Sequence, residues 1–161
     1  RSTGAGRKVA EELLYSQINE SLKPYKVLNH QHSPEIEQYL SQLAESDVKV
    51  NFVPHLIPIN RGILETIYVQ FKDPQPLKGI EDVYKKFYKT EPFVQVLEKD
   101  QDPEIRLVNG TNNCNIGLTV DQEKNMLVIV SVIDNLMKGA SGQAVHNMNI
   151  MCGFEETTGL S

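Results

Sequence analysis

Two histidines separated by a single residue, His30 and His32, are the clearest candidates for chemistry in this chain. They stand in the run NHQHSPEIEQ, where a proline and two glutamates follow them. An imidazole titrates near physiological pH, so the pair is suited to proton transfer, and it is also a common metal ligand. A zinc site needs further ligands, and nothing in the spacing of His55, Cys114 and His146 singles one out. We therefore expect no metal, and either an acid–base role or one packed and one solvated histidine.

Two other stretches are suited to binding an anion. In TGAGRK, Gly4 and Gly6 precede a helix-like run, and Arg7 and Lys8 add positive charge. Backbone N–H groups in such a turn can cradle a phosphate or a carboxylate. In PINRG, Arg61 stands between two β-like segments, and its guanidinium fork matches the same anions. A plain turn and a surface arginine are the alternative interpretations.

A fourth stretch, DNLMKGASGQAVHNMN, combines a helix start with small residues. Asp134 or Asn135 is a good N-cap, but Gly139 and Gly142 each cost about 1 kcal/mol relative to alanine in a helix. Small side chains over two turns indicate that something packs closely against this backbone. It is either another helix or a flat ligand near the positive helix end, and the pattern alone favours packing.

Helices alternate with β segments around these stretches. We predict helices over 10–22, 33–46, 77–91 and 134–154, β segments over 25–32, 48–59, 61–71 and 93–97, and a hairpin over 112–134. Several strands follow one another without a crossover helix, which implies antiparallel or mixed pairing. The sequence therefore predicts an α+β fold, with a mixed, largely antiparallel sheet and helices packed on one face. The apolar arm MLVIVSVI is expected to be a central strand.

Composition narrows the functional class. The chain has 161 residues and a formal net charge of −5, which indicates one domain over residues 1–161. It contains no basic cluster for nucleic acid and no apolar run of about 18 residues for a membrane span. Two distant cysteines indicate a reducing compartment. The opening run RSTGAGRK reads as the middle of a motif, so we expect a fragment of a longer protein.

Taken in order, five runs resemble the carboxy-terminal part of the N-acetyl-gamma-glutamyl-phosphate reductase family. They are GAGRK, HQHSPEIEQ, PINRGILETIY, GTNNCNIG and SVIDNLMKGASGQAVHNMNIMCGFEETTGL, and they span residues 4–160. The run DNLMKGASGQA is also similar to aspartate-semialdehyde dehydrogenases, a related family. The runs HQHSPEIEQ and PINRGILETIY favour the reductase.

The resemblance implies a fold like the carboxy-terminal domain of glyceraldehyde-3-phosphate dehydrogenase, serving as a substrate and dimerisation domain without the Rossmann domain. It implies reduction of N-acetyl-glutamyl phosphate with NADPH in the cytoplasm by a homo-oligomer, either a dimer or a tetramer. The family's cysteine nucleophile lies in a GCYPT-type motif that this sequence lacks. Cys114 and Cys152 do not match that motif and are interpreted as packing residues. The chain alone is thus expected to be inactive and not to bind NADPH tightly.

The resemblance also implies roles for individual residues. It favours His32 as the acid–base group, with His30 as the second choice. The substrate-side residues that it implies are Gly4, Gly6, Arg7 and Arg61. The residues that it places beside the nicotinamide are Asn135 and Gly139. The alternative from another functional class is a non-catalytic oligomerisation domain with a reductase-like fold.

Overall fold

The structure is a computed structural model that describes residue 11 and residues 14–72 and 77–160. It divides the chain into two compact units, Arg1–Asn60 and Arg61–Ser161. The single domain expected over the whole chain stays a prediction.

The first unit combines helices with a small sheet. Its elements are α1 (Tyr15–Ile18), β1 (Lys23–Pro24), α2 (His32–Ala44) and β2 (His55–Leu56). β1 and β2 pair antiparallel. The helix predicted over 10–22 is wrong beyond Ile18, because Asn19 is extended and Glu20 has a φ of 54°.

The β segment predicted over residues 25–32 is also wrong. Lys26 and Leu28 have positive φ values of 46° and 54°, and the N–H of Asn29 donates to the carbonyl of Lys26 at 3.0 Å. This closes a turn in place of a strand. Val27 and Leu28 are exposed, so their apolar character did not indicate a buried strand face.

The helix predicted over residues 33–46 is confirmed as α2, which begins one residue earlier, at His32. Ser33 therefore lies inside the helix. Its Oγ is buried without a hydrogen-bond partner. Glu45 ends the helix in the left-handed conformation, at a φ of 50°.

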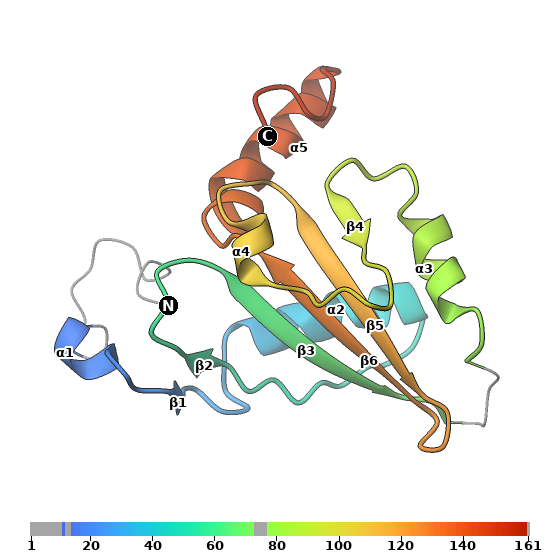
Figure 1. Cartoon of the computed structure of the whole chain (residues 1–161), viewed down its shortest axis with the longest axis horizontal. Coiled ribbons are helices and arrows are strands. Elements are labelled where there is room, and N and C mark those ends of the chain that lie inside the picture. The colour runs from blue at the N-terminus through green and yellow to red at the C-terminus, as the bar shows by residue number, and fades with distance from the viewer. Residues whose placement is uncertain (1–10, 12–13, 73–76, 161) are drawn as a thin grey trace. The chain divides into compact units, whose positions relative to one another are not determined.

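The second unit is built on a four-stranded sheet with the order β3-β6-β5-β4 (Figure 1). Its elements are β3 (Ile63–Gln70), α3 (Ile80–Phe87), β4 (Val94–Val96), α4 (Ile105–Val108), β5 (Cys114–Asp121), β6 (Met126–Ile133), the π-helix η3 (Met137–Ser141) and α5 (Gly142–Cys152). β3, β6 and β5 pair antiparallel, whereas β4 pairs parallel with β5. The predicted α+β class with a mixed, largely antiparallel sheet is confirmed.

The predicted hairpin and its central strand are also confirmed. β5 and β6 are joined by a turn that follows Asp121, and β6 lies between β3 and β5. Its side chains Leu127 and Val132 are buried, as is Val108 of α4, which packs against β6. None of the described helices is long and apolar enough to cross a membrane.

The helix predicted over residues 134–154 is interrupted at its start by η3. There the N–H of Ser141 donates to the carbonyl of Leu136, five residues back, at 3.0 Å. This wider turn changes the helical register, and Met148 and Met151 of α5 are exposed. Gly153 ends α5 with a φ of 71°.

Candidate active site

His30 and His32 differ in burial. His30 is only 8 % exposed, and its ring lies edge-on to the rings of Tyr25 and Phe52, with both centroid distances 5.4 Å. Its Nδ1 accepts a hydrogen bond from the backbone N–H of His32 at 3.2 Å. His32 is exposed at the first position of α2, and the two imidazole centroids are 4.7 Å apart. The pair thus consists of a packed ring that supports a solvent-facing one.

The environment of His30 disfavours its protonated form. Burial lowers the pKa of His30 below its ordinary value, and the charges of His32 and Lys26 lower it further. Because Nδ1 accepts a hydrogen bond, the neutral ring of His30 carries its proton on Nε2. His32 is the member of the pair whose ring is open to a molecule in solution. Its role in proton transfer stays a prediction.

Among the residues that the structure describes, no group of three or more His, Cys, Asp or Glu side chains could hold a metal ion. The Nδ1 of His55 lies 3.1 Å from the carbonyl oxygen of Val53, which accepts when Nδ1 carries the proton.

Arg61 lies beside Asp134 at one end of the large sheet. β3 and β6 run antiparallel, and Ile63 lies opposite Ile133. The residues just before β3 therefore meet the residues just after β6. Nη1 of Arg61 donates to Oδ2 of Asp134 at 3.2 Å, and the side chains are 40 % and 0 % exposed.

Both oxygens of the buried Asp134 carboxylate are occupied. Oδ2 also accepts the N–H of Gly110 at 2.7 Å, and Oδ1 accepts those of Leu136 and Met137 at 2.7 and 3.2 Å. Burial alone would raise the pKa of Asp134, but these three N–H groups and the charge of Arg61 hold it below its ordinary value. Asp134 is thus the residue that caps the start of the C-terminal helical segment, which the sequence left open between Asp134 and Asn135.

Asn135 fixes the neighbouring turn. Its Oδ1 accepts the N–H of Gly62 at 2.7 Å. Gly62 has a φ of +107°, and a Cβ there would lie 2.2 Å from Cγ2 of Ile105, so this position requires glycine. The side chain of Asn135 is buried, and its observed contact is with this turn. The predicted contact of Asn135 with a nicotinamide remains a prediction.

Gly139 is exposed in η3. Its N–H donates to the carbonyl of Asp134 at 3.1 Å. An added Cβ would lie 3.5 Å from Cδ1 of Ile133, which is an ordinary contact. The packing of the chain itself therefore does not demand glycine here, and the small side chain leaves this surface open to a flat group.

The predicted site residues thus fall into three sets. Arg61, Asn135 and Gly139 meet at one end of the large sheet in the second unit. His30 and His32 form their own cluster in the first unit. Gly4, Gly6 and Arg7 lie outside the described residues.

The sequence interpretation missed two features of the second unit. The first is the Asp134 carboxylate as a junction between separate segments. The second is His146, considered above only as a metal ligand, whose Nε2 lies 2.7 Å from Oε2 of Glu156. The amide of Asn149 donates to the carbonyls of Glu156 and Thr158, so α5 holds the C-terminal segment. Only the position of Asp134 directly after an apolar strand could have signalled its role.

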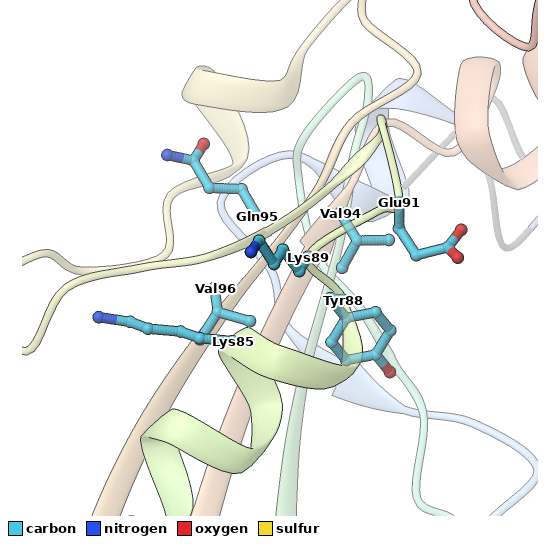
Figure 2. Close-up of a pocket in the computed structure, with 7 residues that line it drawn as sticks. All are labelled: Lys85, Tyr88, Lys89, Glu91, Val94, Gln95 and Val96. Atoms are coloured by element: carbon cyan, nitrogen blue, oxygen red, sulfur yellow. The ribbon is translucent and has the colours of Figure 1, made fainter.

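A pocket of about 230 Å³ lies between the end of α3 and β4 (Figure 2). Its polar lining includes Lys85, Tyr88 and Lys89. Lys85 is paired with Glu98 at 2.7 Å, and burial raises the pKa of Tyr88. None of the predicted site residues lines this pocket, so it is separate from the Arg61 cluster.

Comparison with known proteins agrees with the resemblance. Residues 2–135 match the family model described as the dimerisation domain of semialdehyde dehydrogenase. The chain is 52 % identical over 159 residues to N-acetyl-gamma-glutamyl-phosphate reductase from Pelotomaculum thermopropionicum, covering 99 % of this chain and 46 % of the relative. It is 52 % identical over 158 residues to that of Moorella thermoacetica, covering 98 % and 46 %. The chain thus spans about half the length of these relatives.

Solved structures confirm the fold. Aspartate semialdehyde dehydrogenase II from Vibrio cholerae superposes with a TM-score of 0.64 at 17 % identity, covering 88 % of this chain and 44 % of the other. The same enzyme complexed with ASA gives a TM-score of 0.66 at 15 % identity, covering 92 % and 46 %. The predicted resemblance is confirmed, and the chain belongs to the semialdehyde dehydrogenase dimerisation-domain family.

Proposed function

We propose that this chain is the substrate-binding and dimerisation part of a cytoplasmic reductase that converts N-acetyl-glutamyl phosphate into N-acetyl-glutamate semialdehyde. The observation that carries the proposal is 52 % identity over 99 % of the chain to N-acetyl-gamma-glutamyl-phosphate reductase. The histidine pair and the Arg61 cluster support it, because they offer the two functions that the reaction needs from this part of the protein.

The reaction proceeds in two steps. A cysteine thiolate from a part of the protein outside this chain attacks the acyl phosphate, so the C–O bond to phosphate breaks and a thioester forms. When bound, NADPH supplies the hydride that reduces this thioester. His32 gives a proton to the hemithioacetal oxygen and takes it back as the C–S bond breaks, which releases the aldehyde and the thiolate.

His32 fits the proton-transfer role because it is exposed and braced. As an imidazolium it favours the thiolate form of a neighbouring cysteine, and it can then give its proton to the hemithioacetal oxygen. His30 accepts the backbone N–H of His32, and burial lowers the pKa of His30, which makes it the weaker candidate for the proton. We assign proton transfer to His32 and support to His30.

Arg61 fits the phosphate. Its Nη1 is held by Asp134, whereas its side chain is 40 % exposed, so part of the guanidinium faces outward. A guanidinium matches the geometry of a phosphate or a carboxylate. We assign Arg61 to the substrate anion, together with Gly4, Gly6 and Arg7 of the glycine-rich run.

Of the two residues assigned to the nicotinamide end of NADPH, Gly139 suits direct contact with the ring and Asn135 does not. Gly139 presents an exposed backbone without a side chain, which suits the approach of a flat ring. Asn135 is buried and its Oδ1 holds Gly62, so its contribution is to keep the adjoining turn in place. The dinucleotide phosphates need a Rossmann turn, which we propose lies in another part of the protein.

Two assays separate this proposal from the alternative of a non-catalytic oligomerisation domain. The full-length protein is expected to reduce N-acetyl-glutamyl phosphate with consumption of NADPH, measured by the loss of nicotinamide absorbance. The isolated chain should show neither turnover nor measurable NADPH binding by calorimetry, because it lacks the nucleophile motif and the phosphate-binding turn. Micromolar binding by the chain alone would place the cofactor site here, and an inactive full-length protein would favour the alternative.

Self-association is expected through the exposed side of the large sheet, as a dimer or a tetramer. Leu64 and Tyr68 lie on one face of β3 and are 50 % and 69 % exposed, and burying such side chains in a partner would stabilise the assembly. Sedimentation of the chain at high micromolar concentration should show an oligomer. Tyr68→Glu should shift it toward monomer, whereas Val83→Glu, an equally exposed apolar position on α3, should not. A purely monomeric wild-type chain would contradict the expectation.

A further inference from the structure

We infer that Asp134 is a positioning residue, which holds the Arg61 guanidinium in one orientation for the phosphate of the substrate. This inference rests on the proposed function. It assigns Asp134 a role beyond capping the helical segment that follows it.

The contacts of Asp134 join three separate segments. They come from the segment just before β3 (Arg61), the loop after α4 (Gly110) and the first turn leading into η3 (Leu136 and Met137). The carboxylate is fully buried, and each oxygen accepts two hydrogen bonds. A carboxylate held in this way cannot follow a rotating guanidinium, so it fixes the guanidinium that binds to it.

The backbone at Arg61 is fixed as well. Gly62 is held through its N–H by Asn135 at 2.7 Å, and Ile105 fills the space where a side chain would stand. Consecutive residues after β6, Asp134 and Asn135, thus bind consecutive residues before β3. The Arg61 side chain is thus held at Nη1, and the backbone next to it is held at Gly62.

The anchoring leaves part of the guanidinium available. Only Nη1 bonds to Asp134, and within the described residues Nε and Nη2 make no hydrogen bond. A phosphate needs two such N–H groups in a fixed relation, and an arginine ordered in advance avoids the cost of ordering on binding. The negative charge of Asp134 offsets the positive charge of Arg61. Asp134 therefore favours phosphate binding by orienting the guanidinium more than by strengthening long-range attraction.

A double-mutant cycle in the full-length enzyme tests this role, with Asp134→Asn, Arg61→Ala and the combined variant. We expect Asp134→Asn to raise the KM for the acyl phosphate about tenfold, with a smaller change in kcat. In the Arg61→Ala background the same change should have little further effect on KM, because Asp134 acts through Arg61. Fully additive effects on KM, or an unchanged KM, would overturn the inference.

A second readout does not depend on turnover. Inorganic phosphate should raise the melting temperature of the wild-type full-length protein, and this rise should be lost in Arg61→Ala and reduced in Asp134→Asn. Arg61→Lys keeps the ion pair without the fork and tests the site even if Asp134→Asn does not fold; it too should lose most of the rise. Asp121→Asn is the matched control, because Asp121 accepts the N–H of Lys124 at 2.9 Å in the hairpin turn.

The outcomes distinguish the two proposals. If wild-type protein fails to reduce the acyl phosphate but phosphate protection depends on Arg61 and Asp134, the proposed function is wrong and the positioning role stands. If the wild-type protein is active and phosphate raises the melting temperature of Arg61→Lys or Asp134→Asn by the same amount as that of wild type, the positioning role is wrong and the proposed function stands.

Discussion

If the full-length protein has the proposed reductase activity, replacing His32 by asparagine is expected to lower kcat by about 10²–10⁴-fold, with a smaller change in the KM of the acyl phosphate. Asparagine keeps a similar size and some hydrogen bonding but cannot titrate. His32 is exposed at the start of α2, so the substitution removes proton transfer without removing a packed side chain. Steady-state kinetics across a range of pH values measure this loss.

The control variants separate the proton role from its alternatives. His30→Asn should lower kcat less and should reduce stability, because its ring packs against Tyr25 and Phe52. His55→Asn is the matched exposed control and should leave kcat unchanged. If kcat falls more in His30→Asn than in His32→Asn, the proton-transfer role belongs to His30. If kcat falls less than tenfold in both variants, neither histidine has that role. A metal role predicts instead that chelators abolish activity and zinc restores it.

Replacing Gly62 by alanine is expected to destabilise the second unit by about 3 kcal/mol. Overpacking against Ile105 contributes about 1–3 kcal/mol, and the positive φ of 107° adds roughly 1–2 kcal/mol. Chemical denaturation of the chain measures the change in the free energy of unfolding.

Gly153→Ala provides the matched comparison for Gly62→Ala. Gly153 also has a positive φ, 71°, but an added Cβ would meet nothing within 4 Å. Its substitution should therefore cost only the backbone strain, roughly 1 kcal/mol. Equal costs at the two positions would show that the contact with Ile105 is not the cause.

The large sheet was predictable because its signals are local. The apolar run of β6 and the polar turn before it define a hairpin, and both strands were found where the sequence placed them. The strand predicted over residues 25–32 is absent because its backbone depends on contacts that are distant in the sequence. Their apolar residues resemble a strand, but Lys26 and Leu28 have positive φ values, and the N–H of Leu28 donates to the carbonyl of Phe52, a partner that no local pattern contains.

The candidate site was predictable in its residue types but not in its connections. The sequence singled out Arg61 and Asn135 separately, through their motifs. Their link through Asp134 and Gly62 depends on the register in which Ile63 lies opposite Ile133, and that register appears only once the strands pair. The burial of His30 likewise depends on Phe52, far along the chain.

The π-helix η3 makes the orientation of α5 depend on a single extra residue. A helix turns by about 100° per residue, so a shift of one position exchanges one face for another. In the observed register His146 and Asn149 face inward and hold the C-terminal segment, while Met148 and Met151 face solvent. Length in this segment is therefore as constrained as composition. A one-residue insertion or deletion within Met137–Ser141 would act on the whole of α5, whereas the same change in the surface turn after Asp121 would remain local.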